Sequence, residues 1–125
     1  MNYTLDSGAL IALERRKQRA MHVLQTGARV VVPAPCFAEW WRGRTDHRED
    51  ISRAVTIDWL DARTLRLAGE ALASLPRKRD ECSPTVDAIA MASAASREGD
   101  VLVTSDPEDM FRLQTFFPAV RIVAV

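Results

Sequence analysis

Four acidic residues, far apart in the sequence, follow the end of a short apolar run or lie in the first turns of a helix next to one: Asp6, Glu39, Asp87 and Asp106. Carboxylates that meet in one place repel one another, so they ionise together only if a cation lies between them. An all-oxygen set with no His or Cys beside it selects a hard ion, Mg²⁺ or Mn²⁺, over zinc. A metal-bound water with a lowered pKa can attack a phosphodiester. The pattern therefore indicates a metal site, and phosphoryl chemistry is a common use of such a site.

Each acid also has a purely structural interpretation. Asp6 and Asp106 both fit the role of a helix N-cap, and Asp106 stands directly before Pro107. Glu39 taken alone reads better as a solvent-facing acid near the start of a helix. Asp87 is harder to explain in this way, because the helix around it is apolar nearly all round and is expected to be buried. A buried carboxylate needs a cation or a raised pKa, and no Lys or Arg stands three or four residues away.

The elements that must position these acids alternate between short apolar runs and longer helical patterns. Strands are expected at 3–5, 28–32, 54–57, 100–104 and 121–125. Helices are expected at 9–22 and 64–75, from Pro35 past Glu39, from Ser83 and Pro84 to Gly99, and from Pro107 onward. Such alternation gives right-handed crossovers and a mostly parallel sheet covered on both faces. The runs Val30–Val32 and Val101–Val103 are continuously apolar, as strands buried on both faces require.

Ligands of such a sheet bind beyond the carboxyl ends of its strands. Asp6, Glu39 and Asp106 are expected at that edge because each follows a strand. Asp87 can join them if its helix begins beside the same edge, as a helix that returns to the next strand must. The four carboxylates then converge on one cleft.

Composition sets the remaining limits. A chain of 125 residues is expected to form one domain, residues 1–125. Its 17 basic and 17 acidic residues give no net charge, which argues against a protein that coats nucleic acid by bulk charge but leaves room for local basic patches. Cys36 and Cys82 fit no ligand spacing and read as reduced thiols. The N-terminus does not resemble a signal peptide, and no apolar run is long enough to cross a bilayer, so a cytoplasmic location is expected.

Four segments together resemble the PIN-domain family. Leu5–Leu13 resembles the opening motif, in which a strand ends in a metal-binding Asp, and Pro33–Glu39 resembles the second, in which a Pro-led helix carries a Glu. Asp87–Ala92 resembles the third motif and Val103–Met110 the fourth. The motifs come in the family's order and cover essentially the whole chain. The length and the lack of further domains resemble the bacterial VapC toxins.

The resemblance implies a three-layer α/β/α sandwich with a mostly parallel sheet. It implies a Mg²⁺- or Mn²⁺-dependent endoribonuclease, the toxin of a type II toxin–antitoxin system, with transfer RNA as one candidate substrate. It further implies a homodimer and a VapB-type antitoxin that blocks the site.

The resemblance also assigns roles. Asp6 and Asp87 would be metal ligands, and Glu39 and Asp106 would complete the acidic set. Thr104 and Ser7 would be hydroxyls that orient carboxylates or water. Asp109 would be a further acid, or equally the third residue of a helix that Asp106 caps, so the fourth ligand stays open between Asp106 and Asp109.

Other residues suggest binding to RNA or to a partner. Basic runs occur at 15–19, 42–48 and 77–79, and each reads either as a solvated face or as a contact to the RNA backbone. Trp40 and Trp41 are neighbours on one helix, so one is expected in the core, and the other could stack on a base or fill an antitoxin groove. His22 and His47 read as surface residues.

Two other classes of function compete with a nuclease. A PIN-like module could hold RNA or protein without cutting it, although the complete acidic set argues against this. An aspartyl-phosphate enzyme normally has a second Asp two residues after the first, where Gly8 stands here, and nucleotide-binding folds need a Gly-rich loop that this chain lacks.

Overall fold

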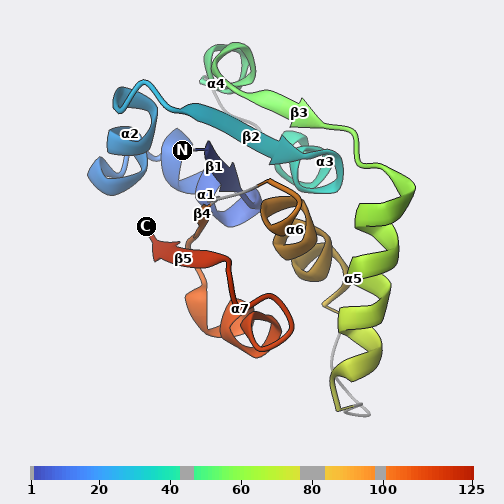
Figure 1. Cartoon of the computed structure of the whole chain (residues 1–125). Helices are drawn as coiled ribbons and strands as arrows, with labels where there is room; N and C mark the ends of the chain where they lie inside the picture. The colour runs from blue at the N-terminus through green and yellow to red at the C-terminus, as the bar shows by residue number, and fades with distance from the viewer. Residues whose placement is uncertain (1, 43–46, 77–83, 98–100) are drawn as a thin grey trace.

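The computed structural model describes residues 2–42, 47–76, 84–97 and 101–125. Its centre is a sheet of five parallel strands in the order β3-β2-β1-β4-β5 (Figure 1). The strands are β1 (Asn2–Leu5), β2 (Arg29–Pro33), β3 (Thr56–Asp58), β4 (Val101–Thr104) and β5 (Arg121–Ala124). The predicted parallel sheet is confirmed. Both apolar runs that the sequence assigns to inner strands, in β2 and β4, are buried.

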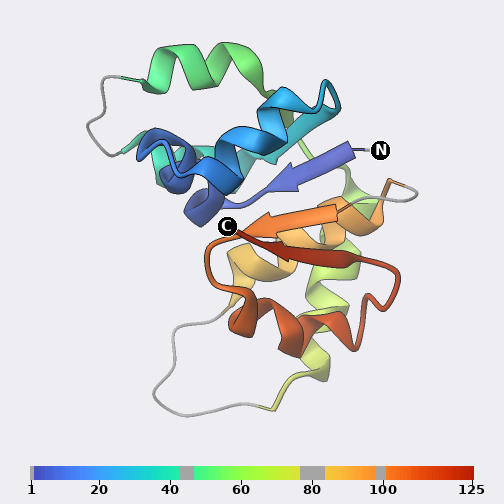
Figure 2. The same cartoon turned by 90° about the vertical axis from the view of Figure 1, so that its left-hand side faces the viewer.

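Seven helices lie in the described part of the chain: α1 (Ser7–Glu14), α2 (Gln18–Gln25), α3 (Ala34–Trp41), α4 (Arg48–Ala54), α5 (Ala62–Ser74), α6 (Thr85–Ala95) and α7 (Pro107–Gln114). α1 packs against α2, α3 and α4, whereas α6 packs against α5 and α7. The two groups lie on opposite sides of the strands (Figure 2). The fold is thus the expected three-layer α/β/α sandwich.

The order of the strands explains this division. The chain moves from β1 to β2 and then to β3 in one direction, and it returns past β1 to reach β4 and then β5. Right-handed crossovers that run in opposite directions must place their helices on opposite faces of the sheet. β1 and β4 are therefore neighbouring strands, and the helices that follow them, α1 and α7, lie on opposite faces of the sheet. Such a switch point is where ligands of open α/β sheets bind.

The predicted helix at 9–22 is wrong in one respect, because it is two helices. α1 ends at Glu14, and α2 begins at Gln18. Between them Arg16 has a φ of 52°, a left-handed conformation that a helix interior does not allow. The apolar spacing continues across the break, since Ala12 and Leu13 before it and Ala20 after it are all buried.

α6 also begins later than predicted. Pro84 occupies the N-cap position just outside the helix, and Thr85 is the first helical residue. Ser83, Gly99 and the basic run 77–79 lie outside the described residues. The buried side of α6 is formed by Ala88, Ala90, Met91, Ala92 and Ala94, which confirms that this helix is buried on most sides. None of the helices in the described ranges is long and apolar enough to cross a membrane.

Candidate active site: an acidic cluster at the carboxyl edge

Asp6 directly follows β1 and is the N-cap of α1. Its Oδ1 accepts a hydrogen bond of 2.8 Å from the backbone N–H of Ala9. The residue is only 7% exposed. Burial raises the pKa of Asp6, hydrogen bonds from Thr104 and Ala9 lower it in part, and the negative charges of Asp106 and Glu39 raise it further. Asp6 therefore does cap α1. Capping alone does not explain its position, because an ordinary N-cap lies at the protein surface and Asp6 is buried close to Asp106 and Glu39.

Thr104 connects Asp6 to the turn that follows β4. Its side chain is fully buried and hydrogen-bonds the Asp6 carboxylate, which requires the hydroxyl to donate. The same oxygen accepts a 3.1 Å hydrogen bond from the backbone N–H of Asp106. Thr104 thus links the carboxylate of Asp6 to the backbone of Asp106, and its role at a metal site stays a prediction.

Asp87 reaches the same place from the other layer. It lies in the first turn of α6 and is half-buried. Burial is the main cause that raises its pKa, to about 6, and the charges of Asp6, Asp109, Glu39 and Asp106 add to the effect in that order. The expectation that α6 begins beside the carboxyl edge is confirmed, because every acid that acts on Asp87 belongs to the expected set.

Glu39 and Asp109 are exposed members of this group. Glu39 lies in α3, and its charge acts on both Asp6 and Asp87. Asp109 lies in the first turn of α7, and a hydrogen bond with the Asp106 side chain is the main cause that raises its pKa. Asp106 occupies the N-cap position of α7, but its side chain makes no capping hydrogen bond. We name these five residues the acidic cluster: Asp6, Glu39, Asp87, Asp106 and Asp109.

The donor chemistry of the acidic cluster fits a hard divalent cation. All five side chains offer oxygen, and burial and mutual repulsion disfavour the ionised forms of Asp6 and Asp87. Yet no three His, Cys, Asp or Glu side chains among the described residues are grouped closely enough to hold an ion directly. Mg²⁺ keeps several of its waters and takes only one or two direct carboxylates, so an open arrangement of this kind suits it. The assignment of ligands remains a prediction.

The Cys36 thiol and the backbone of Gly8 lie close to Asp6. The Cys36 thiol is fully buried and hydrogen-bonds the backbone of Ser7. Burial raises its pKa, and the charge of Asp6 raises it further, so it is an unreactive thiol. Gly8, in the first turn of α1, lies so close to Ser105 that a β-carbon at position 8 would overlap with the Ser105 hydroxyl. Among the described residues, no hydrogen bond of the Ser7 side chain supports the orienting role predicted for its hydroxyl, so that role stays a prediction.

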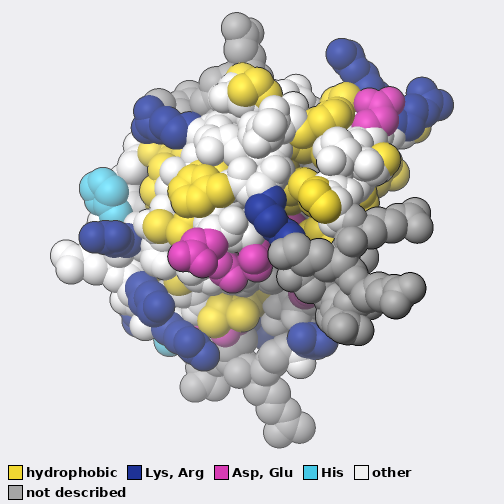
Figure 3. Space-filling model, turned by 90° about the horizontal axis from the view of Figure 1, so that it is seen from below, with side chains coloured by type: hydrophobic (Ala, Val, Ile, Leu, Met, Phe, Trp, Pro, Cys, Tyr) yellow, Lys and Arg dark blue, Asp and Glu magenta, His cyan; other side chains and the backbone are white. Residues whose placement is uncertain are grey.

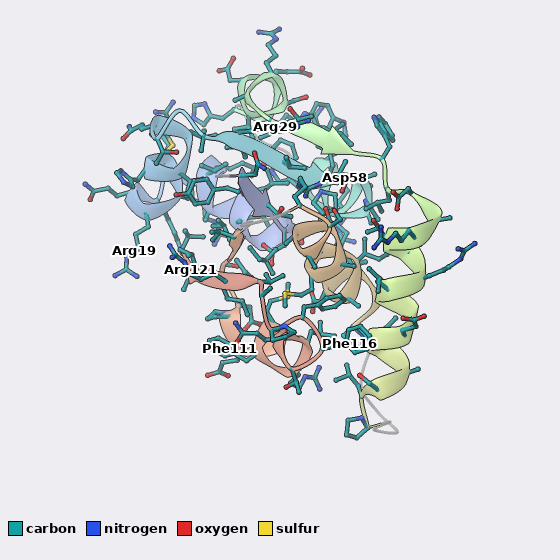
Figure 4. All side chains as sticks on the ribbon, in the orientation of Figure 1. Arg19, Arg29, Asp58, Phe111, Phe116 and Arg121 are labelled. Carbon is teal, nitrogen blue, oxygen red and sulfur yellow. The ribbon has the colours of Figure 1, made fainter. Side chains whose placement is uncertain are left out.

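A second polar cluster, which no sequence pattern predicted, joins the end of α6 to β3 and β1. Arg97 donates to Asp58 Oδ2 at 3.1 Å, to Thr4 Oγ1 at 3.0 Å and to Ser93 Oγ at 2.9 Å. Ser93 in turn donates to Asp58 Oδ2 at 2.6 Å, and the Leu60 N–H donates to Oδ1 at 2.9 Å. Burial raises the pKa of Asp58, but these hydrogen bonds lower it by more. Figure 4 shows Asp58 beside the end of α6.

The aromatic and basic residues singled out in the sequence divide between core and surface. Trp40 is 2% exposed, which confirms that one of the two tryptophans is in the core. Trp41 is half-buried, with Phe37 stacked on its ring at 5.5 Å and the Arg48 guanidinium 4.4 Å from its centre, so its ring already has partners. The basic residues at 15–19 are exposed, and so is His22. His47 is half-buried, and its Nε2 accepts a 3.4 Å hydrogen bond from Arg16.

Comparisons with known proteins bear on the fold. No protein-family model matches the sequence, and neither does any curated protein sequence. Among solved structures, the chain is similar to one from the crystal structure of VapBC2 from Rickettsia felis bound to a DNA fragment from their promoter. The TM-score is 0.67 at 15% sequence identity, over 100% of this chain and 99% of that one. The likeness at this identity establishes the fold: a chain of that complex has the same overall arrangement of helices and strands as this three-layer α/β/α sandwich.

Proposed function

We propose that this protein is a metal-dependent endoribonuclease and the toxin of a type II toxin–antitoxin pair. The observation that supports this most is the meeting of Asp6, from the α1 side of the sheet, with Asp87 and Asp106, from the α6 and α7 side. Asp6 is buried and Asp87 half-buried, and a nearby cation would favour the ionised form of both carboxylates. The VapBC2 likeness supports the assignment to a toxin fold.

The roles of the residues follow from their surroundings. Asp6 and Asp87 would bind the ion directly, because their buried carboxylates gain most from a neutralising charge. Glu39, Asp106 and Asp109 are more exposed and would bind through water or hold a second ion. Thr104 would keep Asp6 in place. A bound Mg²⁺ or Mn²⁺ would supply an acidified water and offset the negative charge that develops on the phosphodiester.

The test uses the purified full-length chain with RNA and added Mg²⁺ or Mn²⁺. We expect cleavage with either ion and none with excess chelator. Asp6→Asn and Asp87→Asn should each reduce the rate by more than about 100-fold, since loss of even an outer-shell partner of a metal ligand costs about 10- to 100-fold. Asp50→Asn is the matched control, because this acid is exposed on α4 and pairs only weakly with Arg53 at 3.9 Å. Full activity of Asp6→Asn would refute the proposal.

The alternative function is a PIN-like module that binds RNA or protein without cutting it. The raised pKa of Asp87 argues against this, because a binding module gains nothing from a strained acidic cluster. A metal titration separates the two functions. An inactive module would show no Mg²⁺- or Mn²⁺-dependent cleavage of any RNA, including transfer RNA.

We also propose a VapB-type antitoxin as the protein partner, a homodimer as the assembly, and the cytoplasm as the location. The antitoxin proposal rests on the similar solved structure, which is of VapBC2 bound to a DNA fragment from their promoter. Co-expression with the product of an adjacent short reading frame tests it: a stable complex that lacks nuclease activity is expected. Light scattering of the chain alone tests the dimer.

A further inference from the structure

Beside the acidic cluster, α7 exposes aromatic and basic side chains that no step above uses. Five large hydrophobic residues in the described ranges are exposed, and two of them are Phe111 and Phe116, at 53% and 37%. Arg112 stands between them in the sequence and is also exposed. Figure 4 places both phenylalanines at α7, and Figure 3 shows hydrophobic and basic side chains next to a group of acidic ones on this face.

Helix geometry places two of these residues, Arg112 and Phe116, in line with Asp109 of the acidic cluster. Asp109, Arg112 and Phe116 are separated by three and four residues, the spacing at which side chains share one face of a helix. Backbone hydrogen bonds from Phe116 and Phe117 to Leu113 continue the turn past the end of α7. The line starts at the acidic cluster, since Asp109 is hydrogen-bonded to Asp106 and its charge acts on Asp87. At 1.5 Å per residue it extends about 10 Å from Asp109 to Phe116.

Arg112 and Phe116 offer different contacts to a nucleic acid. The charge of Arg112 acts on Asp109, so the guanidinium lies near the acidic cluster, where a polyanion would otherwise be repelled. The Phe116 ring packs edge-on against Phe117 at 5.0 Å and 73°, and Phe117 is 5% exposed. The exposed ring is therefore held by the core and does not rotate freely. A fixed aromatic face beside a cation is how proteins bind unpaired bases and their phosphates.

We propose that Asp109, Arg112 and Phe116 form a strip along which single-stranded RNA lies as it enters the acidic cluster, with Arg112 on a phosphate and Phe116 under an unpaired base. This deepens the proposed nuclease function and rests on it. A paired base is already stacked within its helix, so the strip selects unpaired RNA.

The test measures binding without cleavage. The parent is full-length Asp6→Asn with Mg²⁺, and the probe is a fluorescein-labelled ten-nucleotide RNA, either single-stranded or annealed to its complement. Phe116→Leu, which keeps apolar bulk but removes the aromatic face, should weaken single-strand binding by about 5- to 150-fold. Phe116→Trp should restore it. Arg112→Gln should lower the slope of log Kd against log salt by about 0.7, the share of one phosphate.

Two matched controls lie elsewhere on the surface. Trp59 is 77% exposed and follows β3, at the opposite edge of the sheet from β5, against which α7 packs. Arg53 is an exposed arginine of α4. Trp59→Ala and Arg53→Gln should bind RNA as the parent does. Circular dichroism and thermal melting establish that each variant is folded.

The outcomes separate the strip from the nuclease proposal. If the unaltered chain cuts no RNA with either metal, or if Asp6→Asn still cuts, the nuclease function fails. If the unaltered chain cuts RNA but Phe116→Leu and Arg112→Gln bind it as tightly as the parent, only the strip is refuted. The strip is also refuted if the RNA duplex binds as tightly as the single strand. It is refuted as well if Phe116→Leu and Arg112→Gln weaken only the binding of an antitoxin, because the strip would then be a protein-docking surface.

Discussion

Gly8 and Ser105 touch across the switch point, with the backbone of the first turn of α1 against the hydroxyl that follows β4. An added β-carbon at position 8 would overlap with this hydroxyl, and its other close neighbours would be Ser105 Cβ at 3.4 Å and Asp6 Oδ1 at 3.5 Å. The two turns that carry Asp6 and Asp106 are therefore packed closely at position 8, where the Ser105 hydroxyl occupies the place that a β-carbon would take.

Gly8→Ala should stabilise the protein less than a Gly→Ala change in a helix usually does. Ala normally stabilises a helix over Gly by about 1 kcal/mol, but here the Ser105 hydroxyl must rotate away from the new β-carbon and lose its present position. Urea unfolding of Gly8→Ala, Ser105→Gly and the double variant measures both effects. In the Ser105→Gly background, Gly8→Ala should give the full gain. An equal change in stability in both backgrounds would show that the contact with Ser105 has no effect.

Asp87 should make the metal-free protein less stable as the pH rises. Its pKa is raised from 3.8 to about 6 by burial and by nearby acids, so the folded state holds a proton that the unfolded state has lost between these values. Stability should then fall from about pH 4 to about pH 6, by on the order of 1 kcal/mol after solvent screening of this half-buried group. Urea unfolding at a series of pH values measures this. Asp87→Asn should flatten the curve, and an unchanged curve would contradict the assignment.

Thr104→Val should weaken metal binding more than it weakens the fold. Loss of the hydroxyl frees the Asp6 carboxylate and the Asp106 N–H, at a cost of about 1–2 kcal/mol in stability. Loss of an orienting partner typically reduces metal affinity about 10- to 100-fold. Calorimetric titration with Mn²⁺ checks this. Thr104→Ser retains the hydroxyl and should bind the ion nearly as well as the unaltered chain; if it fails as badly as Val, the hydroxyl is not what matters.

Arg97→Met should cost about 2–3 kcal/mol in the free energy of unfolding. Asp58 and Arg97 are about 20% exposed, and removing the cation leaves a partly buried carboxylate without its partner. Arg53→Met provides the comparison, because Arg53 and Asp50 are 80% and 78% exposed and such pairs contribute less than about 1 kcal/mol. Similar losses in the two variants would show that burial does not strengthen the Asp58 pair.

Local patterns in the sequence were enough to predict the parts of the fold that matter for the site. β2 and β4 are continuously apolar because both of their faces are covered, and that pattern needs no knowledge of distant residues. The parallel order then brings Asp6 and Asp106 to one edge. Asp87 was recognisable because its helix is buried on most sides, where a carboxylate is out of place.

Features that depend on tertiary contacts were not predictable in the same way. The break at Arg16 interrupts a helix whose apolar spacing continues, so periodicity alone cannot locate it. Arg97 and Asp58 are 39 residues apart and follow no motif, and only the crossing of α6 over the sheet brings them together. The overlap at Gly8 depends on Ser105 in another layer.

The placement of β1 beside β4 also has a consequence for synthesis of the chain. A ribosome-bound fragment that ends at β3 contains Asp6 and Glu39, whereas the other three acids come from segments made later. Neither half of the chain alone can assemble the site. A nuclease built this way would stay inert toward the translation machinery until nearly all of its own chain had been made and β4 had inserted next to β1.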